Sequence, residues 1–155
     1  MLDCQTLPPR LSAALQDQLP PGGVVAALLP NCPEYPVVVL GTLHAGLTLT
    51  TMNPAYTPSE LAHQLAASKA SILVTSFSLM DKVAATMELY PHLTTVLHLD
   101  AECTGEVPLP SSAHLPFYSF LYTTPATSSP PLDPSTHPPS SPSPPAPPGR
   151  RRASW

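Results

Sequence analysis

Short apolar runs recur along the first two thirds of the chain and predict the strands of a sheet. Residues 24–29 form a continuous apolar run between Gly-Gly and Pro-Asn, which is typical of a strand buried on both faces. Residues 47–52 alternate leucine with threonine, and residues 72–75 and 94–99 form two further short runs. Four strands are therefore expected, and burial of both faces favours a parallel sheet.

Helices are predicted before and between these strands. Leu11, Leu15 and Leu19 recur at the helical period, so a helix is expected to end just before the sequence Pro-Pro-Gly-Gly. Residues 33–46 begin with proline in the first turn and end with glycine, so they predict a buried helix in spite of their valines. Asn31 is the expected cap of this helix.

The clearest local signal is the sequence Thr-Pro-Ser-Glu. Thr57 is expected to be an N-cap, a proline follows at the first helical position, and Glu60 closes a capping box. A helix is therefore predicted from this point to about Lys69. A further helix is expected over residues 79–90, with Ser78 as its cap.

The alternation of strands and helices predicts the fold class. Each connection is long enough for a right-handed crossover between parallel strands. We expect a three-layer α/β fold with a mostly parallel sheet and helices on both faces. The folded part is predicted over residues 22–103, after a helix and linker in residues 1–21. Fourteen of the 24 prolines follow Val107, so residues 104–155 are expected to be a disordered Pro/Ser-rich tail.

Composition narrows the range of partners. Only 10% of the residues are charged while 43% are apolar, so part of the surface is expected to meet a partner. The net charge of -4 gives no attraction to nucleic acid or anionic lipid, and the one basic cluster lies at residues 150–152. No membrane span is predicted, because residues 35–59 are uncharged but contain threonines, a histidine and prolines. No secretory or other targeting signal is recognised.

The reactive side chains show no catalytic or metal-binding spacing. Cys4, Cys32 and Cys103 are odd in number and lack a CxxC pattern, so neither a disulfide framework nor a zinc site is predicted. Cys32 follows a strand at a helix start, where its pKa could be lowered, but a packing role is preferred. His44 and His63 fall on different elements, so they form no metal pair.

The remaining candidates are better explained as ordinary sequence. Asp81 and Glu88 lie on one predicted helix and are interpreted as solvated charges. The spacing of Pro145, Pro148 and Arg150 fits a ligand of SH3 domains, and the sequence Arg-Arg-Ala-Ser before the last residue resembles a basic-directed kinase site. Such strings are frequent in proline-rich sequence. No catalytic, cofactor-binding or metal-binding residue is assigned in this chain.

The sequence of residues 22–76 resembles the first subdomain of the adenylate-forming (AMP-binding) acyl-CoA synthetases, and it is most similar to plant coumarate-CoA ligases and beetle luciferases. Residues 24–34 are similar to the family's buried strand and Asn-Cys-Pro-Glu turn. Residues 41–46 resemble a small-residue helix end, and residues 53–61 resemble the capped second helix. The resemblance covers about half the chain, which makes it far more specific than one short motif.

The resemblance implies a ligase that uses ATP, magnesium and CoA. Such enzymes convert a carboxylic acid to an acyl-adenylate with release of pyrophosphate, and then pass the acyl group to CoA. The resemblance also implies a cytoplasmic or peroxisomal location. The family's phosphate loop, adenine motif and C-terminal lysine domain do not occur in these 155 residues, so an inactive fragment is expected. The alternative is a non-catalytic interaction protein with a scaffold domain and an SH3-ligand-like tail.

The tail suggests a shift of reading frame. Codons can be chosen for residues 144–155 such that reading one base earlier encodes Ser-Ser-Gly-Thr-Thr-Gly-Pro-Pro-Lys-Gly-Val-Val. That string resembles the family's phosphate loop, in which backbone N–H groups and a lysine offset phosphate charge. We therefore hypothesise that the tail is frame-shifted from about residues 134–137. The nucleotide sequence tests this directly.

Overall fold

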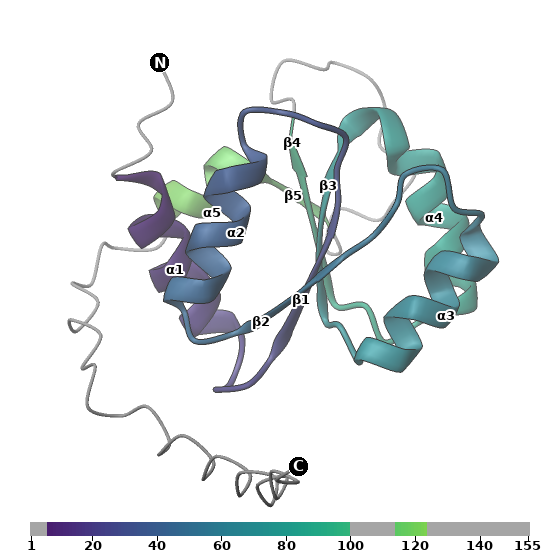
Figure 1. Cartoon of the computed structure of the whole chain (residues 1–155), viewed down its shortest axis with the longest axis horizontal. Helices are drawn as coiled ribbons and strands as arrows, with labels where there is room; N and C mark the ends of the chain where they lie inside the picture. The colour runs from purple at the N-terminus through teal and green to yellow at the C-terminus, as the bar shows by residue number, and fades with distance from the viewer. Residues whose placement is uncertain (1–5, 100–113, 124–155) are drawn as a thin grey trace, which may run out of the picture.

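The computed structural model describes residues 6–99 and 114–123 (Figure 1). Within these residues no helix has the length and apolar character needed to cross a bilayer. The elements in chain order are α1 (Leu7–Gln18), β1 (Val24–Leu28), α2 (Tyr35–His44), β2 (Thr48–Thr51), α3 (Pro58–Ser68), β3 (Ile72–Ser76), the 3-10 turn η1 (Phe77–Leu79), α4 (Met80–Leu89), β4 (Thr95–Leu99), β5 (His114–Pro116) and α5 (Phe117–Thr123).

The strands form one sheet in which every neighbouring pair is parallel. Its order is β2-β1-β3-β4-β5, so the chain first moves from β1 to β2 and then crosses back over β1 to β3. Helices α1, α2 and α5 lie on one face of the sheet, and α3 and α4 lie on the other (Figure 1). This confirms the predicted three-layer α/β architecture.

Successive residues of each inner strand serve two separate hydrophobic cores. Val25 and Ala27 of β1 pack in the cluster with α1, α2 and α5, whereas Ala26 and Leu28 pack in the cluster with α3 and α4. β3 divides its side chains in the same way. This explains the continuous apolar runs, because a strand covered on both faces has no side that needs polar residues.

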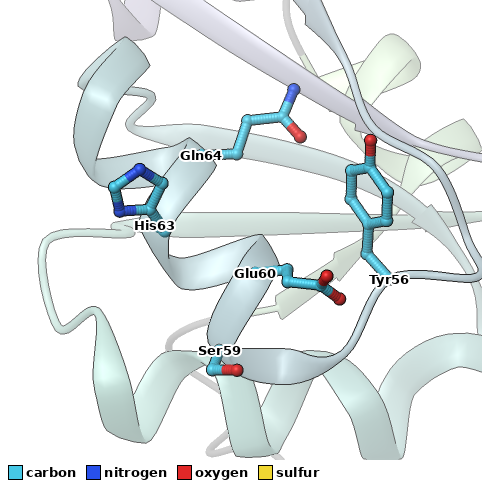
Figure 2. A pocket seen from close by; sticks show the side chains of 5 residues that line it. All are labelled: Tyr56, Ser59, Glu60, His63 and Gln64. Atoms are coloured by element: carbon cyan, nitrogen blue, oxygen red, sulfur yellow. The ribbon is translucent and has the colours of Figure 1, made fainter.

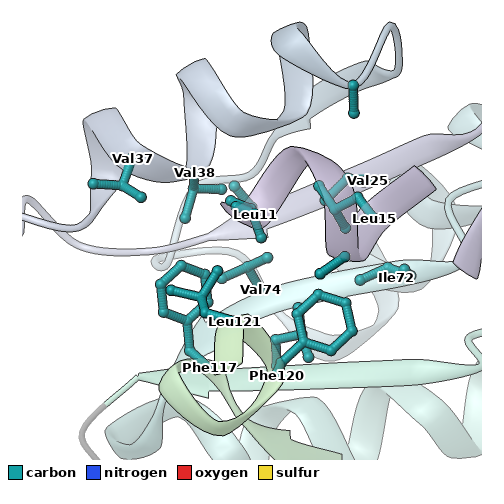
Figure 3. Packing of buried hydrophobic residues seen from close by; sticks show 14 of the residues in the cluster. Leu11, Leu15, Val25, Val37, Val38, Ile72, Val74, Phe117, Phe120 and Leu121 are labelled. Atoms are coloured by element: carbon teal, nitrogen blue, oxygen red, sulfur yellow. The ribbon is translucent and has the colours of Figure 1, made fainter. Parts of the chain in front are cut away.

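Helices α1 and α2 approach each other closely at Gly41. A Cβ atom at this position would lie 2.6 Å from Cδ2 of Leu11 and 2.8 Å from its Cβ and Cγ, which is closer than real Cβ atoms come. Leu11 is fully buried between the two helices and the sheet (Figure 3). The absence of a side chain at Gly41 therefore sets the spacing of this helix pair.

Part of the predicted disordered tail is structured, which corrects the expectation for residues 114–123. This segment forms β5, which pairs with β4, and α5, which packs on α1. Phe117, Phe120 and Leu121 are buried in the same cluster as α1 and α2 (Figure 3). They share one helix face, and proline content hid this short pattern. Residues 104–113 and 124–155 lie outside the described residues, so the expectation of disorder there remains a prediction.

Two expected helix caps are absent, whereas the capping box is present. Glu34, and not Asn31, precedes α2, and it makes no side-chain cap bond. Leu79 precedes α4, because Ser78 lies inside η1 and its hydroxyl is 2.9 Å from that of Ser76. Glu34 has helical backbone angles (φ -74°, ψ -20°) and Leu79 has φ -104° and ψ 4°, so neither helix start has the extended N-cap conformation in which a side chain caps the first turn.

The predicted capping box at the start of α3 is fully formed. The backbone N–H of Thr57 donates to Oε2 of Glu60 over 2.8 Å, and the Glu60 N–H donates back to Oγ1 of Thr57 over 3.4 Å. At the other end Lys69 adopts a left-handed conformation with φ of 56°. A residue in this conformation ends the helix and turns the chain toward β3.

Candidate functional site

The carboxyl ends of the strands meet at one edge of the sheet, because every strand pair is parallel. The direction in which the chain adds strands reverses between β1 and β3. In open α/β sheets ligands bind beyond the carboxyl ends of the strands at such a reversal. A ligand site is therefore expected at the segments that follow β1 and β3.

The segment after β1 brings together a thiol, a carboxylate and a phenol. The Tyr118 hydroxyl of α5 donates to Oε1 of Glu34 over 3.2 Å. Burial raises the pKa of the Cys32 thiol above its usual range, and the adjacent Glu34 carboxylate raises it further, against a lowering by the Tyr35 backbone N–H. A protonated, partly buried thiol is a weak nucleophile. The structure therefore supports the packing role of Cys32, which contacts the first core cluster.

The segment after β3 offers hydroxyl groups and an aromatic ring. The Thr75 hydroxyl donates to the Leu28 carbonyl over 3.1 Å and so ties the carboxyl ends of β3 and β1 together. The Phe77 ring stands edge-on to the His98 ring with centroids 6.0 Å apart. These groups stiffen the edge of the sheet, and none of them carries a fixed positive charge that could bind a phosphate.

The three basic side chains among the described residues, Arg10, Lys69 and Lys82, lie away from the carboxyl ends of β1 and β3 or are held by other contacts. The Arg10 guanidinium lies over the Tyr122 ring, 5.1 Å from its centroid. The Lys82 ammonium donates to the Pro54 carbonyl, which holds the loop after β2 against α4. Lys69 lies at the turn between α3 and β3, at the amino end of the strands.

A hollow of about 410 Å³ lies beside the start of α3 (Figure 2). It is lined by Tyr56, Ser59, Glu60, His63 and Gln64. Hydrogen bonds from the Thr57 backbone N–H and hydroxyl lower the pKa of the Glu60 carboxyl, so the group is ionised at neutral pH. The hollow thus combines an aromatic ring with a negative charge.

The residues singled out from the sequence do not converge on a site. His44 is exposed at the end of α2, while His63 is exposed on α3 at the other face of the sheet. Asp81 and Glu88 are exposed on α4, in keeping with solvated charges. No group of three potential metal ligands occurs among residues 6–99 and 114–123. Cys4, Cys103, the SH3-ligand-like string and the kinase-like string lie outside the described residues.

Comparison with known proteins decides the family. Residues 6–146 match the family described as AMP-binding enzyme, which is most of the chain. The chain belongs to this family. It is 41% identical over 78 residues to a long-chain-fatty-acid–CoA ligase of Escherichia coli O6:H1, which covers 50% of the chain and 13% of the relative. It is also 40% identical over 79 residues to a 4-coumarate–CoA ligase of Pinus taeda, covering 51% of the chain and 14% of that ligase.

The fold of this AMP-binding family member is shared with a solved structure. The apo structure of Mycobacterium smegmatis MbtA superimposes with a TM-score of 0.68 and 24% identity over 84% of this chain and 23% of that one. The predicted resemblance to acyl-CoA and coumarate-CoA ligases is thus confirmed. The chain spans about one seventh of the length of the curated ligases that it matches.

Sequence reasoning overlooked the hollow beside α3, although it identified the sequence around it. Residues 53–61 predict a capped helix that resembles one of the family, and the capping box explains Thr57 and Glu60 without a ligand. Tyr56 gave a signal that could have been used. Its ring stands in the short loop just before a predicted helix start, where an aromatic side chain is expected at the surface. The structure shows it 40% exposed beside the exposed Glu60 carboxylate, and aromatic rings are enriched in binding surfaces.

Proposed function

We propose that this chain contributes the opening α/β layer of an ATP-dependent carboxylic acid–CoA ligase. The family match over residues 6–146 carries the proposal. The named relatives join a long-chain fatty acid or 4-coumarate to CoA, which supports the same two-step reaction here. An acid and ATP would give an acyl-adenylate and pyrophosphate, and CoA would then displace AMP. The acid would be a fatty or aromatic carboxylate.

We further propose that the 155-residue chain does not catalyse this reaction by itself. Charge that builds on the ATP phosphates must be offset by backbone N–H groups and a cation. The sequence has two lysines, Lys69 and Lys82, and neither lies in a Gly-rich loop. Lys82 is hydrogen-bonded to the Pro54 carbonyl, and Lys69 follows a helix at the wrong end of the strands. ATP, magnesium and CoA would be bound by family segments that this sequence does not contain.

The domain division follows from the same proposal. Residues 22–103 would form part of the ligase domain, and the segment beyond about residues 134–137 would be read out of frame. The family match runs to residue 146, so its last residues overlap the proposed out-of-frame segment. Genomic and transcript sequencing across these codons tests the frame shift. A shifted frame that encodes a Gly-rich loop with a lysine supports it, and any other sequence rejects it.

The role in a ligase is tested by a segment exchange. Residues 24–99 of this chain would replace the matching segment of the Pinus taeda ligase. The control chimera carries the segment of the 4-coumarate–CoA ligase CCL1 of Humulus lupulus, a relative that is 44% identical to this chain over 62 residues. We expect the chimera to form 4-coumaroyl-CoA, because the segment supplies scaffold and no catalytic residue. A chimera that folds as stably as the control but makes no acyl-adenylate contradicts the proposal.

The lack of activity is tested on the chain itself. A ligand that binds the folded state raises its melting temperature by mass action. We expect no rise with MgATP and 4-coumarate or palmitate, and no pyrophosphate release. The full-length Pinus taeda ligase serves as the positive control. Pyrophosphate release that depends on the acid would show that the chain is active.

A second candidate function is a non-catalytic interaction protein. One observation favours it: within the described residues, strand β2 is paired on one side only, at an edge of the sheet. An open edge of this kind accepts a strand from another chain. The segment exchange also separates the two candidates, since a scaffold specialised for interaction would not support ligase activity.

A further inference from the structure

Strand β2 lies at one edge of the sheet that residues 6–99 and 114–123 form. Within residues 6–99 and 114–123 it pairs with β1 alone. The N–H groups of Thr48 and Met52 donate to carbonyls of the β1 side over 2.9 Å each. In a parallel ladder the alternate residues face the other way. The N–H and C=O groups of Leu49 and Thr51 therefore point outward, away from the sheet.

One outward acceptor of this edge is already held by a side chain. Nε2 of Gln64 donates to the Thr51 carbonyl over 2.9 Å and lies 3.4 Å from the Thr50 hydroxyl oxygen. Gln64 also forms part of the lining of the hollow beside α3 (Figure 2). The carboxyl end of the β2 edge and the hollow are therefore adjacent parts of one surface.

The hollow is suited to a cation. The Tyr56 ring and the Glu60 carboxylate both line it, and both side chains are exposed. A lysine or arginine head group is attracted by the face of an aromatic ring and forms charge-assisted hydrogen bonds with a carboxylate. The described residues carry five carboxylates, Asp17, Glu34, Glu60, Asp81 and Glu88, against the three cations Arg10, Lys69 and Lys82. The charge of this part of the chain thus favours a basic partner.

We propose that the open edge of β2 and the adjoining hollow form a docking site for an extended segment of a partner protein that carries a lysine or arginine. The segment pairs with the outward N–H and C=O groups of Leu49 and with the outward N–H of Thr51, while the Thr51 carbonyl keeps its bond from Gln64. Its basic side chain enters the hollow between Tyr56 and Glu60. Backbone pairing supplies affinity, and the hollow supplies the choice of side chain. The hollow follows the carboxyl end of β2, whereas the thiol, carboxylate and hydroxyl groups described above follow β1 and β3.

Binding is measured with the full 155-residue chain and a labelled, end-capped peptide, Val-Thr-Val-Arg-Val-Thr-Val. Two control peptides carry glutamate in place of arginine, or N-methyl groups that prevent strand pairing. We expect the arginine peptide to bind about tenfold more tightly than the glutamate peptide, from one exposed ion pair and one cation–π contact. The N-methylated peptide should not bind.

Two variants locate the site. Thr51→Pro removes an outward N–H without breaking the ladder to β1, so it should abolish binding, while Thr51→Val should bind normally. Glu60→Gln retains the capping box, because glutamine also accepts the N-cap hydrogen bond at that position. It removes the negative charge, so it should reduce the difference in affinity between the arginine and glutamate peptides. Glu88→Gln, an exposed carboxylate on α4, is its control. Melting temperatures verify that each variant is folded.

Three results would overturn the proposal. One is binding that Thr51→Pro leaves unchanged, because the edge would then not be used. Another is equal affinity for the arginine and glutamate peptides. The third is a monomer–dimer equilibrium of the chain, seen by sedimentation, that Thr51→Pro abolishes, because the occupant of the edge would then be a second copy.

Discussion

The contact between α1 and α2 makes Gly41→Ala the most informative single change. The new methyl would lie 2.6 to 2.8 Å from three carbons of Leu11, a fully buried residue. One of these carbons is Cβ, which cannot move unless α1 itself moves. Overpacking of a core costs about 1 to 3 kcal/mol, and backbone displacement places this case near 3. Alanine regains about 1 kcal/mol of helix propensity over glycine. We therefore expect a net loss of about 2 kcal/mol.

The loss is measured by urea unfolding followed by circular dichroism. The midpoint should fall while the dependence of the free energy on urea stays unchanged. Leu11→Ala removes two of the three short contacts, so the double variant should be more stable than the sum of the single changes by at least about 0.5 kcal/mol. Gly46→Ala is the control, since a Cβ there meets nothing within 4 Å and any cost comes from its φ of 70°.

One result would refute the packing argument. If Gly41→Ala raised stability by about 1 kcal/mol, helix propensity alone would be acting and the close approach of α1 to α2 would not exist in solution. Additive effects of the Leu11 and Gly41 changes would lead to the same conclusion.

Three further predictions test other parts of the fold. Lys69→Gly should stabilise the chain by about 0.5 to 1 kcal/mol in urea unfolding, because glycine adopts the left-handed conformation without strain but loses more entropy on folding. Phe117→Ala should cost about 3 to 5 kcal/mol, whereas a change in a disordered tail would have no effect. The pKa of Glu60 is lowered in the folded state, so its stabilising effect is present above the unfolded value of about 4.3 and is lost as the pH falls through the folded pKa. Glu60→Gln should therefore reduce the acid dependence of the melting temperature between pH 3 and 6, and an unchanged profile would contradict the capping box.

The candidate sites differ in how much of them the sequence could predict. The capping box at Thr57 and Glu60 is a local arrangement, and it was predicted with its partners. The raised pKa of Cys32 was not, because it depends on burial under neighbouring elements. The hydrogen bond from Tyr118 to Glu34 joins residues 84 positions apart, so no local sequence pattern predicts it.

The sequence by itself determined the alternation of strands and helices, the parallel character of the sheet and the start of α3. These features arise from side chains within a few residues of one another and from burial on both faces of a strand. Only the tertiary structure decided the strand order, the inclusion of α5 in the core and the closeness of Leu11 to Gly41. It also decided that Gln64 holds the open edge of β2 beside the hollow. These features depend on contacts between distant segments, which form only when the layers pack together.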